Sequence, residues 1–215
     1  MRTIEEIFGL SKIVVLVTCE DFDLAAKACQ AIIDGGLKAV SFNMYSQKDY
    51  VTLEKLIKAF PKLEIGASKI IDAAGFMSAS LAGAKFISSP GMNEELYSGI
   101  STRYNDAHFL PGVINPSQIM ESMSRSYRVM TLFPIELLGE QILEEYAETF
   151  PHAKFVARGN NITIENMDDF LVRSNVVGVM LNSIATKDLI ASGNFDEIKL
   201  RAKAAVAKAH ELLKL

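Results

Sequence analysis

The chain of 215 residues contains only two cysteines and no tryptophan. Cys19 and Cys29 form no Cys-x-x-Cys pair, so the sequence favours neither a disulfide framework nor a thiol redox motif. The longest apolar runs, such as Ile13–Val17, are far shorter than the roughly 20 residues of a membrane-spanning helix. The N-terminus also lacks the apolar run of a signal peptide. We therefore expect no membrane partner and a cytoplasmic location.

The sequence also has no excess of positive charge. Its formal net charge is −4, so it lacks the basic surface expected of a nucleic-acid-binding protein. About half of the residues, 49%, are hydrophobic and 22% are charged, which is typical of a globular domain. Because no proline-rich, serine-rich or charged linker interrupts the chain, we expect one domain that spans residues 1–215.

Clusters of metal or cofactor ligands are missing as well. His108, His152 and His210 fall at a predicted strand start, just after a helix and in the last helix, and no His/Cys group has the spacing of a zinc site. The pair Gly35-Gly36 precedes a strand instead of following one, so it is not a dinucleotide-binding fingerprint. We expect no metal and no cofactor.

Short β-rich runs recur along the chain with helical patterns between them. Eight strands are predicted: Ile13–Val17, Ala39–Asn43, Leu63–Ala67, Lys85–Ser88, His108–Leu110, Arg128–Phe133, Ala153–Ala157 and Val176–Leu181. Strands that are apolar on both faces and alternate with helices are typical of a parallel sheet covered by helices. Eight such units favour a closed (β/α)8 TIM barrel over an open doubly wound sheet.

Helix boundaries support this spacing. Asp21 is a candidate N-cap for the helix before Gly35-Gly36, and the two glycines end that helix. Pro61 and Pro151 each follow a predicted helix and precede a strand. In a TIM barrel the chemistry belongs to the loops at the C-terminal ends of the strands, so the candidate site residues are sought there.

Several strand ends and their flanks carry family-like motifs. These are Ile65-Gly66-Ala67, Phe86-Ile87-Ser88-Ser89-Pro90-Gly91, Leu110-Pro111-Gly112-Val113, Leu132-Phe133-Pro134-Ile135-Glu136 and the closing segment Ile190–Asp196. Over nearly its whole length the sequence resembles the family of 2-keto-3-deoxy-6-phosphogluconate (KDPG) and 4-hydroxy-2-oxoglutarate (KHG) aldolases. The resemblance implies a class I aldolase barrel, a homotrimer and a 2-oxo acid or sugar phosphate as ligand.

In members of that family a lysine on the sixth strand forms a Schiff base with pyruvate, a glutamate on the second strand moves protons and a nearby arginine holds the carboxylate. The corresponding positions of this sequence are Thr131, Ser41 and Tyr45. A threonine hydroxyl cannot form an imine, and a serine without an adjacent base is no acid-base catalyst at neutral pH. The resemblance therefore predicts the architecture, while the standard Schiff-base mechanism cannot run on these residues.

Lys69 stands where the family has a threonine after the third strand, and we expect it at the mouth of the barrel. It is the only candidate for an imine-forming lysine at the strand ends, a role that requires the neutral amine, which burial or a nearby cation such as Arg158 favours. The alternatives are that Lys69 anchors a ligand, or that it points to solvent or pairs with Asp72.

The phosphate-binding end of the family is partly retained. Its glycine pair after strand 7 becomes Gly159-Asn160-Asn161, and its Gly-Ser after strand 8 becomes Asn182-Ser183. Small residues in these two loops suit an anion-binding cradle of backbone N–H groups. The alternative is a turn that tolerates positive φ.

We predict a ligand site made of these residues and of two from the matching motifs: Pro90, Phe133, Arg158, Gly159, Asn160 and Ser183. Two functions remain open for it. One is an aldolase-type lyase acting on a 2-oxo acid, and the other is a non-catalytic relative that binds a 2-oxo acid or sugar phosphate.

Overall fold

A computed structural model describes residues 3–9, 11–101 and 108–213. Parallel strands form one sheet in the order β5-β4-β3-β2-β1-β9-β8-β7-β6. Their bounds are β1 Ile13–Val17, β2 Ala39–Asn43, β3 Glu64–Ser68, β4 Phe86–Ser88, β5 His108–Leu110, β6 Gly112–Val113, β7 Val129–Leu132, β8 Lys154–Arg158 and β9 Val176–Leu181. Strands that are consecutive in sequence lie side by side, the first strand β1 pairs with the last strand β9, and β5 and β6 stand at the two ends of the order.

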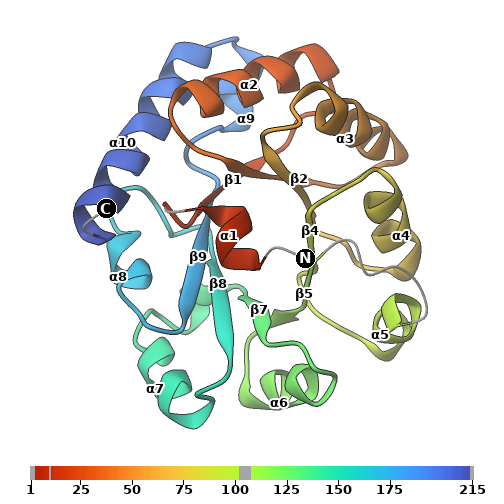
Figure 1. Ribbon diagram of the computed structural model, residues 1–215, viewed down its shortest axis with the longest axis vertical. Helices are drawn as coiled ribbons and strands as arrows, with labels where there is room; N and C mark the ends of the chain where they lie inside the picture. Colours follow the sequence, from red (N-terminus) through yellow and green to blue (C-terminus); the bar gives the residue numbers. More distant parts are fainter. Residues whose placement is uncertain (1–2, 10, 102–107, 214–215) are drawn as a thin grey trace.

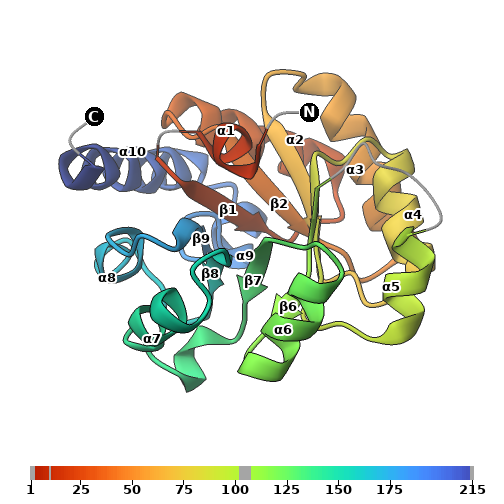
Figure 2. The ribbon, with the colours of Figure 1, turned by 60° about the horizontal axis from the view of Figure 1, so that its bottom comes forward.

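Apart from α1, the helices surround this sheet as an outer ring, as Figures 1 and 2 show. Their bounds are α1 Ile4–Phe8, α2 Phe22–Asp34, α3 Gln47–Ala59, α4 Ala73–Leu81, α5 Glu94–Ser101, α6 Pro116–Ser124, α7 Ile142–Thr149, α8 Asp168–Leu171, α9 Lys187–Ala191 and α10 Phe195–Leu213, with a 3-10 turn at Ile135–Leu137. Among the described helices, none has both the length and the apolar character needed to cross a membrane.

The predicted fifth strand, His108–Leu110, is β5, and the structure continues it as β6 after Pro111, which breaks the strand because it has no N–H to donate. β5 pairs with β4 and β6 pairs with β7, so the single residue between them joins the two edges of the sheet. Thr131 N–H also donates to the carbonyl of Pro111 at 2.8 Å. The (β/α)8 barrel is thereby confirmed, with the fifth strand broken in two.

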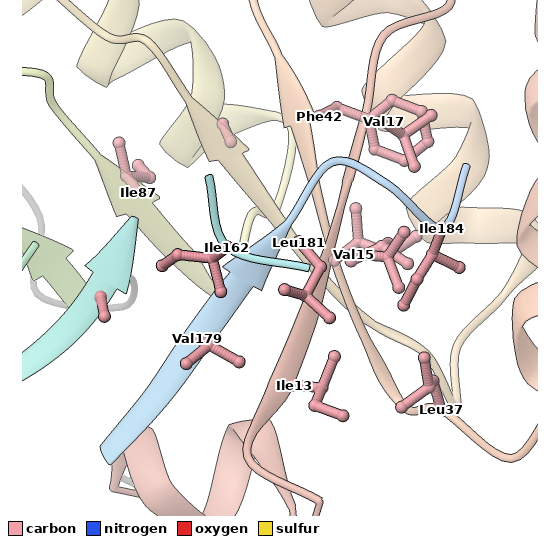
Figure 3. Packing of buried hydrophobic residues seen from close by; sticks show 14 of the residues in the cluster. Ile13, Val15, Val17, Leu37, Phe42, Ile87, Ile162, Val179, Leu181 and Ile184 are labelled. Atoms are coloured by element: carbon pink, nitrogen blue, oxygen red, sulfur yellow. The ribbon is translucent and has the colours of Figure 1, made fainter. Parts of the chain in front are cut away.

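Side chains on each strand alternate between two apolar layers. Ile13, Val15 and Val17 of β1 face the outer helices, and Figure 3 shows them in the cluster that fills this layer. Val14 and Leu16 face the barrel interior and pack in a second cluster. The strands are buried on both faces, which is why their sequences are continuously apolar.

Helix α1 closes the N-terminal end of the barrel. It lies across the centre of the ring in Figure 1 and buries Phe8, whose ring meets that of Phe86 at 5.1 Å between centroids. Gly178 leaves room for this contact, because a Cβ there would lie 2.6 Å from the Phe8 ring. With one end closed, the open rim lies at the C-terminal ends of the strands.

The predicted helix boundaries are confirmed. The Asp21 side chain accepts a hydrogen bond from Leu24 N–H at 2.8 Å, and α2 ends at Gly35, followed by Gly36 with φ of 94°. Two strands are shifted by one residue from the prediction: β3 is Glu64–Ser68 instead of Leu63–Ala67, and β8 is Lys154–Arg158 instead of Ala153–Ala157. Ser68 and Arg158 therefore belong to rigid strands and not to loops.

Candidate functional site

Two adjoining cavities open at the C-terminal rim. The first, called the charged cavity below, has a volume of about 470 Å³ and is lined by Lys69, Arg158 and Lys187 with polar residues that include Thr18, Asn43, Asn160, Asn182 and Ser183. The second, called the side cavity, measures about 690 Å³. Tyr45, Lys69, Phe133 and Arg158 line both. The rim is therefore hollowed where the fold predicts a site.

A larger cavity of about 1070 Å³ lies at the opposite end of the barrel, between α1 and the starts of β2 and β3. Its lining mixes lysines such as Lys38 and Lys62 with glutamates such as Glu5 and Glu6. Because it lies at the N-terminal end of the strands and carries both signs of charge, we place the candidate site at the rim instead.

Arg158 is the most buried cation of the rim, with 5% of its surface exposed. Its Nη2 donates to Asn43 Oδ1 at 3.2 Å, and its guanidinium lies over the Phe133 ring, 5.0 Å from the centroid. Nη1 is buried without a protein partner. Burial lowers the pKa of Arg158 to about 10, so the group still carries its charge at neutral pH.

Asn43 fixes this guanidinium from across the barrel. It accepts from Arg158 and donates through Nδ2 to Thr18 Oγ1 at 2.9 Å. β1, β2 and β8 are thus linked by one chain of hydrogen bonds at their C-terminal ends. The guanidinium is held on one side, and its second nitrogen remains available for a ligand.

Lys69 stands at the rim with a left-handed backbone, φ 65°. Its Nζ donates to Tyr45 Oη at 2.5 Å and lies 4.5 Å from the centroid of the Tyr45 ring. Lys187 approaches the same ring at 5.6 Å. Asp72, considered from the sequence as a partner for Lys69, instead accepts from Gly75 N–H and caps α4. Lys69 therefore lines both cavities beside Arg158, held by Tyr45.

Thr131 and Ser41 lie deeper in the barrel, and neither lines the two cavities. Both are fully buried. Thr131 pairs with Val156, two residues before Arg158, so it occupies the next inward position below the guanidinium. Its hydroxyl has no protein partner.

Ser41 belongs to a buried hydroxyl cluster. Its Oγ lies 2.5 Å from Ser68 Oγ, which also accepts from Ser88 Oγ at 2.9 Å. The three serines come from β2, β3 and β4, so small hydroxyl side chains fill this part of the interior. None of them contacts a carboxylate or imidazole in the hydrogen bonds of the described chain, so the cluster contains no base.

The loop after β8 joins the loop after β7. Asn160 N–H donates to Glu136 Oε1 at 3.2 Å, and Asn160 Oδ1 accepts from Asn182 Nδ2 at 3.1 Å. Gly159 is required for space and not for a left-handed backbone: its φ is not positive, and a Cβ there would lie 2.3 Å from Glu136 Oε2. Of the alternative considered from the sequence, the turn is present at Asn160-Asn161, but none of residues 159–161 has a positive φ.

The remaining predicted residues divide between the cavities. Ser183 lines the charged cavity, and its buried hydroxyl has no protein partner. Pro90 lines the side cavity, and Phe133 lies beneath Arg158 at the wall that both cavities share. Within the part of the chain that the structure describes, no group of three His, Cys, Asp or Glu side chains can hold a metal ion.

Comparison with known proteins accounts for this arrangement. A family model described as KDPG and KHG aldolase matches residues 4–200. The chain belongs to this family. The match spans the barrel from α1 to the start of α10, so every candidate site residue lies inside the family's own fold.

Named aldolases align over most of the chain. The 2-dehydro-3-deoxy-phosphogluconate aldolase of Pseudomonas aeruginosa is 28% identical over 84% of this chain and 81% of its own length. The KHG/KDPG aldolase of Escherichia coli is 23% identical over 95% of each chain.

A crystal structure of the KDPG aldolase of Legionella pneumophila, with pyruvate captured as a covalent carbinolamine, superposes with a TM-score of 0.88 at 25% identity. It covers 95% of this chain and 98% of that one. The KDPG aldolase of Zymomonas mobilis with 3-phosphoglycerate gives a TM-score of 0.83, also at 25% identity, with 96% of each chain covered.

Sequence reasoning missed Asn43, Thr18 and Lys187. Asn43 was read only as part of a strand end, and its partner Arg158 is 115 residues away in sequence. Lys187 begins a helix after β9 and belongs to no motif that the sequence singled out. The three residues share only a position at or shortly after the C-terminal end of a strand. That feature is too general to select them from the sequence.

Proposed function

We propose that this member of the aldolase family binds a small anionic 2-oxo acid in the charged cavity, with Arg158 as the principal anchor. The observation that carries the proposal is the guanidinium itself: it is 5% exposed, fixed by Asn43 and Phe133, and its Nη1 has no protein partner. Buried charges of this kind are normally paired, so the geometry suits a carboxylate as the missing partner.

The charge of the cavity supports the same ligand class. Lys69, Arg158 and Lys187 line it, and none of its described lining residues is acidic. Three cations around 470 Å³, with no acidic residue among the described lining, attract an anion strongly at low ionic strength. The Ser183 hydroxyl and the amides of Asn160 and Asn182 add hydrogen-bonding groups beside these cations.

By the family resemblance, Thr131 and Ser41 stand at the positions of the family's lysine and glutamate. We therefore propose that the ligand binds without the standard covalent step. A hydroxyl cannot form an imine with a ketone, and the hydroxyl cluster around Ser41 supplies no base. We infer that the ligand is held and not cleaved through the sixth-strand position.

A second candidate is a carbon-carbon lyase that uses Lys69 as its imine-forming amine. The observation in its favour is that Lys69 lines both cavities together with Arg158, the group that would hold the carboxylate of pyruvate. Against it stands the hydrogen bond from Nζ to the Tyr45 hydroxyl, which imine formation would have to break.

Trapping with borohydride separates the two candidates. The protein is incubated with millimolar pyruvate and sodium borohydride, and its intact mass is measured for wild type, Lys69→Ala and Lys62→Ala, a control at the opposite end of the barrel. Binding without chemistry predicts an unchanged mass for all three. A pyruvate adduct on wild type and Lys62→Ala that disappears in Lys69→Ala would establish the lyase candidate instead.

Calorimetry tests binding itself. Titration with pyruvate is expected to give a saturable heat for wild type and affinity at least about tenfold weaker for Arg158→Met, because charge-assisted hydrogen bonds contribute about 1.5–3 kcal/mol. Equal affinity of the two proteins would overturn the assignment of Arg158. We further propose, from the family resemblance, one domain, a homotrimeric assembly and a cytoplasmic location.

A further inference from the structure

The side cavity adjoins the charged cavity through the wall formed by Tyr45, Lys69, Phe133 and Arg158. A carboxylate at Arg158 therefore lies at the boundary of both spaces. The side cavity is the larger, about 690 Å³ against about 470 Å³. The rest of a ligand that is bound through its carboxylate therefore has room in the side cavity.

The two cavities differ in chemistry beyond their shared wall. The charged cavity adds Lys187 and several amides and hydroxyls. The side cavity adds apolar groups, among them Met44, Ile71 and Pro90, and its one added charged side chain is the Asp72 carboxylate. A second anionic group in the side cavity would meet that carboxylate and no further cation.

Ile71 and Gly75 shape the side cavity. Ile71 lies on its lining with 68% of its surface exposed, so an apolar ligand group would bury it. Gly75 leaves space beside the Tyr50 ring, because a Cβ there would lie 2.8 Å from the Tyr50 hydroxyl. The desolvated environment also raises the pKa of Tyr50, whose hydroxyl stays neutral at physiological pH.

We propose that the side cavity holds the uncharged, apolar tail of a 2-oxo acid whose carboxylate is bound at Arg158. This rests on the proposed function and deepens it, since it names the substrate class: 2-oxo acids with one charged end and an aliphatic or aromatic tail. Dianionic 2-oxo acids that extend their second charge into this cavity are disfavoured by Asp72 and by the absence of a further cation among its described lining residues.

Three probes test the proposal by calorimetry: pyruvate, phenylpyruvate and 2-oxoglutarate. Burial of a phenyl ring predicts that phenylpyruvate binds wild type about tenfold tighter than pyruvate or more. 2-Oxoglutarate, with its second carboxylate, is expected to bind no tighter than pyruvate.

A single substitution should invert this preference. Ile71→Lys places a cation in the side cavity at an exposed position, so it is expected to strengthen 2-oxoglutarate binding and weaken phenylpyruvate binding, each by about fivefold or more. Leu137→Lys is the matched control, because Leu137 is also exposed, at 71%, and lines neither cavity. The control is expected to change neither affinity.

The outcomes separate this inference from the proposed function. If pyruvate binds through Arg158 but 2-oxoglutarate is the tightest of the three ligands, the tail site is wrong and the proposed function stands. An equal response of Ile71→Lys and Leu137→Lys also overturns the tail site. If no 2-oxo acid binds wild type, the proposed function and the tail site fail together.

Discussion

The guanidinium of Arg158 is charged, almost fully buried and paired on one side only. Its surroundings offer the side-chain oxygen of Asn43 and the Phe133 ring, and within the described chain it forms no ion pair with a carboxylate. Such a group costs the native state desolvation energy that a bound anion would offset. Arg158 therefore favours ligand binding at the expense of the stability of the unliganded protein.

Arg158→Met should reveal this opposition. Without added ligand, the variant is expected to be more stable by about 1–3 kcal/mol, the usual cost of a buried group with unmet hydrogen bonds, which raises the Tm by several degrees. With 2-oxo acid present, wild type should gain stability and the variant should not. Differential scanning fluorimetry measures both; a variant less stable than wild type in both conditions would show that Arg158 is a structural residue.

Some of the rim residues could be predicted from the sequence and others could not. Arg158 and Lys69 could be predicted because each is a basic residue at the end of a predicted strand, in a sequence that resembles the family over nearly its whole length. Phe133 was predicted for the same site as part of a family motif, whereas Asn43 was not, because it reaches Arg158 from β2 and only the closed barrel brings the two together.

Elements are held in register by glycines at close approaches. Gly112 in β6 lies against the backbone of the loop after β4: a Cβ there would be 2.3 Å from the Pro90 carbonyl carbon and 2.5 Å from two carbonyl oxygens. Backbone cannot move aside as a flexible side chain can. This contact couples the strand that closes the barrel to the loop that carries Pro90.

Gly112→Ala is accordingly expected to destabilise the protein by about 3 kcal/mol or more, at the upper end of overpacking costs. Gly91→Ala is the control, because nothing lies within 4 Å of a Cβ at that position. Urea unfolding monitored by circular dichroism gives both free energies. Equal stabilities would contradict the contact.

Gly159→Ala should act on function more than on stability. Its Cβ would meet side-chain atoms of Glu136 and Asn161, which can move. Displacing Glu136 removes the acceptor of Asn160 N–H and shifts the loop that borders the charged cavity. We expect 2-oxo acid affinity to fall about threefold to tenfold with a stability loss below about 1 kcal/mol; a larger loss of stability with unchanged affinity would contradict this role.

Strand and helix positions were predictable because the strands are mainly apolar and because capping residues, glycines and prolines mark the helix boundaries. The errors lie at strand ends: β6, which continues the fifth strand beyond Pro111, was not predicted, and the polar residues Ser68 and Arg158 belong to β3 and β8 and not to the loops after them. The loop after β8 was misjudged because its glycine serves a close approach to Glu136, a contact made across two loops.

For the whole molecule, the family resemblance predicts a homotrimer. Large exposed apolar side chains are spread over several helices, among them Val51, Leu81, Met120 and Leu200. Light scattering coupled to size exclusion should give three times the chain mass of 23.6 kDa. A monomer at micromolar concentration would contradict the trimer.

The barrel supplies a hollow, positively charged rim whose deepest cation has an unpartnered nitrogen, and the proposed 2-oxo acid site depends on that nitrogen. Its most direct test is the calorimetric titration of wild type and Arg158→Met with pyruvate. The account predicts saturable binding by wild type and at least about a tenfold loss in the variant. Identical binding isotherms, or no binding by wild type at millimolar pyruvate, would contradict it.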